Sequence, residues 1–158
     1  MATIAVTGGS GLIGGALAGS LANRGDTVIR LVRRPTTTPG EATWDPSAGT
    51  IDPIEHLDAV VNLAGAPIGR PWTRSHKVAI LTSRLAATRT AAELASTHGA
   101  VLVNGSAVGY YGSDRGDEVL SEESASGQTY LAEVCRQWEA ATAAASDAGC
   151  RVALARTG

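Results

Sequence analysis

The chain has 158 residues, 44% of them hydrophobic and 18% charged, and a formal net charge of −2 at pH 7. This length suits one domain with a buried core, and the ordinary composition argues against intrinsic disorder. Because the charges form no basic stripe, no apolar run reaches the ~18 residues of a membrane span and no secretory leader is apparent, we expect a cytoplasmic protein without a nucleic-acid or membrane partner.

Apolar, β-branched runs alternate with segments of helical periodicity along the whole chain. The segments expected to be strands are Thr3–Val6, Thr27–Val32, Ala42–Trp44, Ala59–Ala64, Val101–Val103 and Arg151–Ala155. A helix is expected directly after the first strand. Further helical segments are expected at Ile54–Leu57 (one turn), at Ser75–Ser96, with Val78, Leu81, Leu85 and Leu94 facing inward, and at Leu131–Ala148. Gly109–Gly127 is expected to be a long polar loop. This alternation predicts an α/β fold, a doubly wound parallel sheet of Rossmann type with strand order 3-2-1-4-5-6, as one domain over residues 1–158.

The most informative stretch, Thr-Gly-Gly-Ser-Gly-Leu-Ile-Gly at residues 7–14, follows the first strand directly. Gly9, Gly11 and Gly14 form a G-x-G-x-x-G, and Gly8 doubles the first glycine. Between a strand and a helix this spacing is a dinucleotide fingerprint. We expect Gly9 to permit the tight turn, Gly11 to let the backbone approach a pyrophosphate, and Gly14 to allow close helix–strand packing. The free N–H groups of the helix start would then bind the phosphates.

Arg33 lies about 20 residues beyond the glycine turn, where an acidic residue would bind a ribose 2′-hydroxyl and an arginine accommodates a 2′-phosphate. With Arg34 adding a second charge, the sequence predicts NADP rather than NAD; the alternative is a solvated basic pair. The residues expected to bind the cofactor are Gly8, Gly9, Gly11, Leu12, Ile13, Gly14, Arg33, Arg34, Leu63, Ala64, Gly65, Arg84 and Ser106. For Asn62–Gly65 the alternative to cofactor binding is an ordinary strand end, and for Arg84 it is structural pairing with a carboxylate.

A hydroxyl and two phenols, Ser106, Tyr110 and Tyr111, follow the fifth strand, where a substrate carbonyl would meet the nicotinamide. Tyr130 opens the next helix, where it could equally be an aromatic residue packing on the sheet. The two cysteines, Cys135 and Cys150, have neither metal-ligand nor redox spacing, so no metal site is predicted.

The whole series of motifs resembles the extended short-chain dehydrogenase/reductases, the NAD(P)-dependent epimerase/dehydratase family, and within it the atypical epimerase-family branch. The carriers of the resemblance are residues 6–14, Val32–Pro35, Trp44–Pro46, Asn62–Gly65, Ser83-Arg84, Ser106–Gly112, Asp114–Glu118, Leu131–Arg136 and Trp138-Glu139. Members of that family are about twice as long and build the substrate pocket with a C-terminal lobe, so the chain looks like an N-terminal portion. The resemblance implies a small-molecule substrate, a sugar nucleotide or another carbonyl or hydroxyl compound.

Working members of that family use a Ser or Thr with a Y-x-x-x-K pair, whose lysine lowers the phenol pKa. Tyr130 matches the tyrosine, but Val134 stands at the lysine position. Registering the family pattern on Tyr111-Gly112 puts Ala107 at the serine position, and a one-residue slip restores Ser106. The catalytic candidates are therefore Ser106, Tyr111 and Tyr130, with Tyr110 as a further proton donor.

Two hypotheses follow: an NADP-dependent oxidoreductase or epimerase with an atypical proton donor, or a non-catalytic NADP-binding sensor or interaction module. The last strand is an apolar sheet edge, and bare edges invite pairing. We expect it to be poorly ordered, or covered by a second copy of the chain (a homo-oligomer) or by a C-terminal remainder. We also expect the 158-residue chain by itself to bind cofactor weakly and to lack turnover.

Overall fold

A seven-stranded sheet runs through the centre of the computed structural model, which describes all of residues 1–158. The strands are β1 (Thr3–Val6), β2 (Thr27–Val32), β3 (Glu41–Asp45), β4 (Thr50–Ile51), β5 (Ala59–Asn62), β6 (Val101–Ala107) and β7 (Val152–Thr157). Their order across the sheet is β4-β3-β2-β1-β5-β6-β7, and all neighbours are parallel except the β3–β4 hairpin. Apart from β4, which the sequence analysis missed, this is the predicted doubly wound order.

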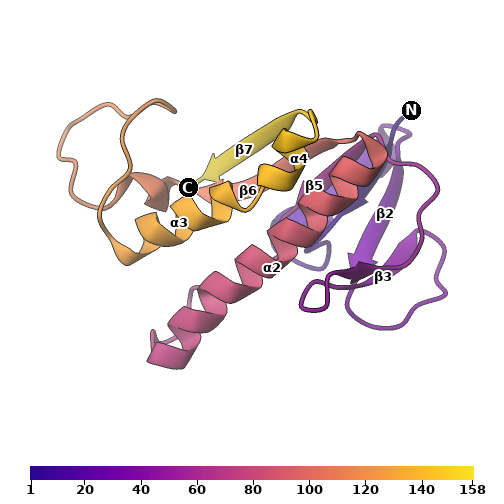
Figure 1. Cartoon of the computed structure of the whole chain (residues 1–158), viewed down its shortest axis with the longest axis horizontal. Helices are drawn as coiled ribbons and strands as arrows, with labels where there is room; N and C mark the ends of the chain where they lie inside the picture. The colour runs from indigo at the N-terminus through magenta and orange to yellow at the C-terminus, as the bar shows by residue number, and fades with distance from the viewer.

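Helices cover both faces of the sheet. They are α1 (Leu12–Asn23), α2 (Arg74–His98), α3 (Tyr130–Ala140) and α4 (Ala143–Asp147), with a short 3-10 helix, η1 (Val108–Tyr111), after β6. Figure 1 shows α2 running diagonally across one face with α3 and α4 beside it. The first helix packs on the opposite face, where its Leu21 meets Ile4, Val6 and Val61. No helix combines the length and the apolarity that a bilayer span requires.

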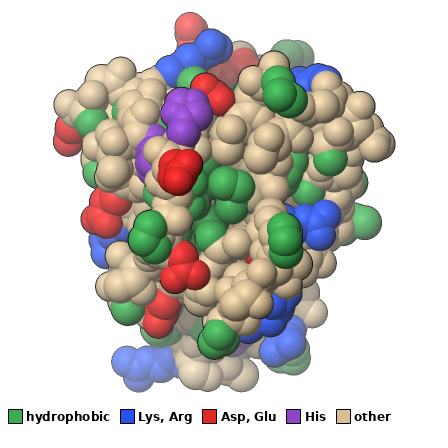
Figure 2. Space-filling model, turned by 90° about the vertical axis from the view of Figure 1, so that its right-hand side faces the viewer, with side chains coloured by type: hydrophobic (Ala, Val, Ile, Leu, Met, Phe, Trp, Pro, Cys, Tyr) green, Lys and Arg blue, Asp and Glu red, His purple; other side chains and the backbone are tan.

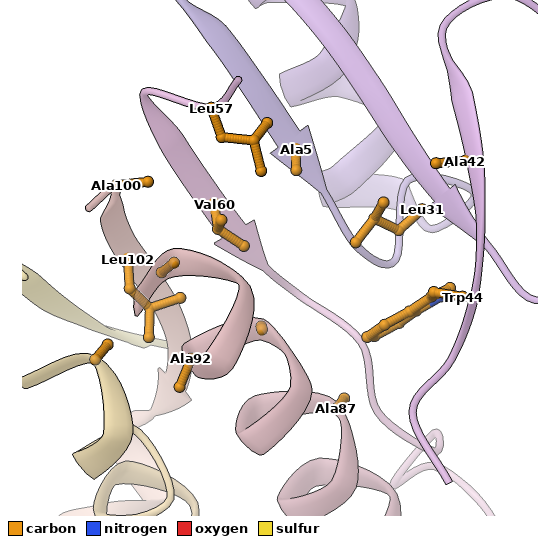
Figure 3. Packing of buried hydrophobic residues seen from close by; sticks show 13 residues of the cluster. Ala5, Leu31, Ala42, Trp44, Leu57, Val60, Ala87, Ala92, Ala100 and Leu102 are labelled. Atoms are coloured by element: carbon orange, nitrogen blue, oxygen red, sulfur yellow. The ribbon is translucent and has the colours of Figure 1, made fainter. Parts of the chain in front are cut away.

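The main core lies between the sheet and α2, and it depends on strand alternation. Ala5 of β1 and Val60 of β5 face α2, and both are fully buried (Figure 3). The helix meets them with alanines, since the residues buried on its inner face include Ala87, Ala91, Ala92 and Ala95, each at most 1% exposed. The predicted inner face was wrong in part: Val78, near the start of α2, is 56% exposed, and most of the residues buried against the sheet lie in the second half of the helix.

Two predicted helical segments differ in the structure. Ile54–Leu57 forms no helical turn; it is irregular chain that lays Leu57, 1% exposed, into the core. An isolated turn has little stability of its own, so this packing decides its shape. The segment predicted as one helix over Leu131–Ala148 is divided into α3 and α4. At the break, the Thr142 hydroxyl donates to the carbonyl of Glu139 at 2.7 Å, a local bond that competes with the helical pattern.

The two edges of the sheet differ. Strand β7 pairs with β6 through six consecutive residues, and Leu154 on it is 40% exposed. Its other edge has no strand partner, so the expected cover for this edge remains a prediction. The opposite edge ends in the short β4 hairpin. Figure 2, which looks onto the β2–β3 side, shows acidic, basic and histidine side chains interspersed with hydrophobic ones, with no basic stripe on this face.

Candidate functional site

The glycine turn after β1 is shaped by two close backbone approaches. Gly8 has a φ of +65°, and a Cβ on it would lie 2.8 Å from the Leu63 carbonyl oxygen. A Cβ on Gly14 would lie 2.3 Å from the Gly8 carbonyl oxygen, which no side chain permits. Gly14 therefore allows the close packing predicted for it. The tight turn, however, depends on Gly8 rather than Gly9, because Gly9 has no positive φ and only Gly8 must adopt the left-handed region.

The start of α1 is left open toward this turn. Its N-cap residue, Gly11, offers no side chain to the first helical N–H groups, and the first turn holds no acidic residue. Unpaired N–H groups and the positive end of the helix dipole therefore face outward, as an anion site requires. Leu12 and Ile13 are 92% and 59% exposed, which leaves their side chains available to a ligand at this turn.

A fully buried set of neutral polar side chains, here named the amide cluster, fastens the turn to its neighbours: Thr7, Asn62, Thr88 and Asn104. Thr7 donates to Asn62 Oδ1 at 2.7 Å, and its oxygen accepts the N–H groups of Leu63 and Ala64. The Asn62 amide donates to Thr88 Oγ1 at 3.0 Å and to Asn104 Oδ1 at 2.7 Å. The cluster ties β1, β5, β6 and α2 together, and it holds Leu63 and Ala64 against Gly8.

The two arginines after β2 differ in their contacts. Arg34 donates two hydrogen bonds to Glu41, at 3.0 and 2.8 Å, and is therefore held against β3. Arg33 is exposed and makes no hydrogen bond or ion pair. Sequence reasoning did not single out Arg30, whose aliphatic carbons lie over Gly9, 3.5 Å from where a Cβ would be. The only indication of this contact in the sequence was the position of Arg30 on the strand next to the glycine turn.

Ser83 and Arg84 of α2 clamp the backbone N–H and C=O of Ala66, in the loop after β5. The Ala66 N–H donates to Ser83 Oγ at 2.9 Å, and Arg84 Nη1 donates to the Ala66 carbonyl at 3.0 Å. The guanidinium also lies against Gly65, where a Cβ would be 3.1 Å from Arg84 Cζ. No carboxylate pairs with Arg84, so the alternative of structural ion pairing does not apply to it.

Ser106 and Tyr111 meet in a second polar set, the ion-pair cluster, formed by Ser106, Tyr111, Glu139 and Arg156. Arg156 donates to both carboxylate oxygens of Glu139 at 2.8 Å, and Ser106 donates to the same carboxylate at 2.6 Å. Arg156 also donates to the Tyr111 hydroxyl at 2.9 Å. The only hydroxyl hydrogen of Ser106 is thus engaged in the hydrogen bond to Glu139. Glu139 and Arg156 were missed by sequence reasoning, although the resemblance included Trp138-Glu139.

Tyr110 and Tyr130 are engaged in other contacts. The guanidinium of Arg156 lies 3.5 Å from the centroid of the Tyr110 ring. The Tyr130 hydroxyl donates to the backbone carbonyl of Lys77 at 2.6 Å, which fastens the start of α3 to α2. Burial raises the pKa of Tyr130, and the nearby charge of Arg84 only partly opposes this. Val134, at the position of the family lysine, is 3% exposed and belongs to the core side of α3.

The candidate residues thus fall into two groups. The glycine turn, Leu63–Gly65 and Arg84 lie together around the carboxyl ends of β1 and β5. Ser106, on β6, and Tyr111, on η1, lie farther along the sheet, and their hydroxyls are bonded to Glu139 and Arg156. The first group has the backbone shape and open N–H groups that fit a dinucleotide, whereas the second is internally satisfied.

Comparison with known proteins places this arrangement among relatives. A model of the NAD dependent epimerase/dehydratase family matches residues 4–158. An epimerase family protein of Mycobacterium bovis is 43% identical over 99% of the chain and 53% of its own length. The chain thus spans about half the length of the curated relatives it matches.

Two solved structures are also similar. One, described as the nucleoside-diphosphate sugar epimerase from Corynebacterium glutamicum, has a TM-score of 0.85 and 48% identity, over 99% of this chain and 34% of that one. The other is human epimerase family protein SDR39U1, solved with NADPH, with a TM-score of 0.84 and 31% identity over 99% of this chain and 53% of that one.

Proposed function

The chain belongs to the NAD-dependent epimerase/dehydratase family, and on this premise we propose that it binds NADP at the glycine turn. The observation that carries the proposal is the cradle at Gly8 and Gly14, whose Cβ positions are filled by backbone, beside the uncapped start of α1. Backbone N–H groups can approach a pyrophosphate only where side chains are absent. The NADPH found with the human relative supports the same cofactor.

The residues proposed to hold the cofactor follow from this cradle. The free N–H groups of Leu12, Ile13 and Gly14 bind the pyrophosphate, and Leu12 and Ile13 cover it with their exposed side chains. Leu63–Gly65 lies on the β5 side, held in place by Thr7. Arg33, exposed and free of partners, binds the 2′-phosphate, while Arg34 contributes less because Glu41 occupies its fork.

We further propose that the protein is an oxidoreductase or epimerase-like enzyme acting on a small molecule, a sugar nucleotide or another carbonyl or hydroxyl compound. A bound nicotinamide supplies reversible hydride transfer. The description of the Corynebacterium glutamicum relative as a nucleoside-diphosphate sugar epimerase supports this substrate class. Because the chain spans about half of its relatives' length, the substrate lobe would be supplied by further chain.

One set of observations favours the alternative of a non-catalytic NADP-binding sensor or interaction module. The lysine position holds buried Val134, the Tyr130 proton is bonded to a backbone carbonyl, and burial keeps the pKa of that phenol high. A chain extended to the length of its relatives should separate the two readings. Oxidation of NADPH in the presence of a panel of carbonyl compounds supports the enzyme; tight NADPH binding without oxidation of any of them supports the sensor.

The NADP assignment is tested by charge reversal. Arg33→Asp should weaken NADPH binding by about 1.5–3 kcal/mol, the range of a charge-assisted hydrogen bond, and leave NADH binding unchanged, as measured by calorimetry. Arg34→Gln should cause a smaller loss, and Arg89→Asp, at an exposed site on α2, should cause none. Equal losses for both cofactors in Arg33→Asp would show that the 2′-phosphate lies elsewhere.

A further inference from the structure

Arg84 is a half-buried cation without a counter-ion. The fork of its guanidinium uses Nη1 for the carbonyls of Ala66 and Ile80, at 3.0 and 3.1 Å, while Nη2 and Nε have no hydrogen-bond partner. The ionisable groups whose charges it feels are Cys135 and Tyr130, and both are neutral at pH 7. Burial lowers the pKa of Arg84, as expected for a positive charge that nothing balances.

A second unpaired donor lies beside it. The indole of Trp138, on α3, has its ring centroid 5.0 Å from the Arg84 guanidinium. Trp138 is 8% exposed, and its Nε1 is the one buried side-chain nitrogen or oxygen in the protein that has no hydrogen-bond partner. Buried indole N–H groups normally find an acceptor, since leaving one unpaired is costly. The guanidinium thus lies over the indole ring, and neither its Nη2 and Nε nor the indole Nε1 has an acceptor in the protein.

The position of this pair separates it from the adenosine end of the proposed cofactor site. Arg33 follows β2, on one side of β1, whereas Arg84 and Trp138 lie over β5 and β6, on the other side. Trp138 contacts β6 at Gly105, where a Cβ would be 3.5 Å from its ring. In a doubly wound sheet the cofactor crosses β1, so its reactive end points toward β5 and β6.

We propose that Arg84 and Trp138 form a subsite for an oxyanionic group of the substrate, a carboxylate or a phosphate. The guanidinium fork offers Nη2 and Nε, the geometry that suits two oxygens of such a group, and the indole N–H offers a third donor. The pair would complete two unpaired groups and balance the buried charge at the same time. This inference rests on the proposed function, since it assigns the substrate end of the same site.

Nuclear magnetic resonance can observe this subsite directly, because the chain has only three tryptophans. The indole N–H resonance of Trp138, assigned by its loss in Trp138→Phe, should shift saturably on titration with malonate or with inorganic phosphate at constant ionic strength. Malonamide, which has the shape of malonate without its charge, should not shift it. The Trp72 indole, bonded to the Ile68 carbonyl at 2.9 Å, is the internal reference. The anion that binds more tightly shows whether the subsite takes a carboxylate or a phosphate.

Variants sharpen the test. Arg84→Gln should weaken the anion affinity by roughly tenfold or more, Arg84→Lys by less, and Arg89→Gln, the same charge change at an exposed site on α2, should have no effect. Trp138→Phe keeps the Ala66 clamp intact and should weaken binding roughly fivefold, read from backbone amides near Gly65. The resonance of Trp44, which is 3% exposed, reports whether each variant is folded.

The outcomes are distinguishable from those of the cofactor proposal. NADPH should shift the amides of Gly8–Gly14 whether or not the subsite exists, so absence of that shift overturns the cofactor site alone. No saturable shift of the Trp138 indole by either anion, equal shifts by malonate and malonamide, or equal losses in Arg84→Gln and Arg89→Gln would each overturn the oxyanion subsite.

Discussion

The amide cluster and the ion-pair cluster each contain one residue of β6, Asn104 and Ser106, which lie two residues apart on one face of the strand. The first is neutral, and each of its four side chains is 0% exposed. The second carries a full ion pair, and the side chains of Arg156 and Glu139 keep 16% and 10% of their exposure. Nearly the same place on one strand thus supports two kinds of polar network, and the depth of burial decides which.

Desolvation explains the difference. Beneath the glycine turn no water reaches the side chains, and an ion there would lose more hydration than its partner returns. Amides and hydroxyls can satisfy one another completely, as Thr7 and Asn62 do. Nearer the edge strand, residual contact with water lowers the cost of the charges, so an Arg–Glu fork can join α3 to β7. The following predictions test this contrast, beginning with the largest expected effect.

Removing Arg156 should cause the greatest loss. Arg156→Ala leaves the Glu139 carboxylate largely buried without its partner, and we expect the free energy of unfolding to fall by about 3 kcal/mol in urea denaturation. Replacing both members together, Glu139→Leu with Arg156→Met, should recover a large part of this loss, because no lone charge remains. If the double variant lost as much free energy of unfolding as Glu139→Leu and Arg156→Met lose together when made singly, the desolvation argument would be contradicted.

Asn62→Ala should cost somewhat less, about 2 kcal/mol, because it leaves neutral rather than charged groups unpaired. Thr88 and Asn104 would each lose a partner in a dry interior. The control is Thr97→Val, also on α2, whose exposed hydroxyl returns to its own helix at the Glu93 carbonyl and should matter little. If Asn62→Ala were as mild as this control, the amide cluster would not be a stabilising unit.

Thr7→Val should cost about 1 kcal/mol and should also weaken NADPH binding, since the hydroxyl of Thr7 holds the N–H groups of Leu63 and Ala64 near the glycine turn. Thr7→Ser keeps the hydroxyl and should retain NADPH affinity. Calorimetry on the two variants checks the prediction. Equal affinities in Thr7→Val and Thr7→Ser would mean that the loop after β5 does not need this anchor.

The smallest effect is a dependence of stability on pH, to which only the ion-pair cluster of the two should contribute, because the amide cluster has no titratable group. Burial by itself would raise the pKa of Glu139, but the hydrogen bonds from Arg156 and Ser106 and the charge of Arg156 outweigh it and hold the pKa below the ordinary 4.5. The stabilisation is therefore fully present above pH 4.5 and is lost as the pH falls through the lowered value.

Thermal unfolding of wild type and Glu139→Gln between neutral and acidic pH measures this contribution as the difference between the two melting curves. The difference should shrink below the ordinary pKa of a glutamate. Asn62→Ala, whose cluster contains no titratable group, should differ from wild type by a constant amount over the same range. A pH-dependent difference for Asn62→Ala would show that the two clusters are coupled.

Sequence by itself determined the sheet and the order of its strands, apart from β4, because these follow from short-range signals. Buried strands read as continuous apolar runs, helices as spaced ones, and glycines mark a turn wherever backbone must meet backbone. The fingerprint at residues 7–14 shows this well, since Gly14 has the close packing that its spacing predicts. Its predicted ligand contacts, and the cofactor preference assigned to Arg33, remain predictions.

Only the tertiary structure decided how the polar side chains are used. Sequence spacing could not show that Ser106 donates its hydrogen bond to Glu139, 33 residues away, or that the Tyr130 hydroxyl donates to a backbone carbonyl of α2, 53 residues away. It also could not choose Gly8 over Gly9 for the turn, or alanines over Val78 for the inner face of α2. A hydrogen bond or a close contact depends on distances of a few ångströms between elements that are remote in sequence, and those distances exist only once the sheet and its helices have packed.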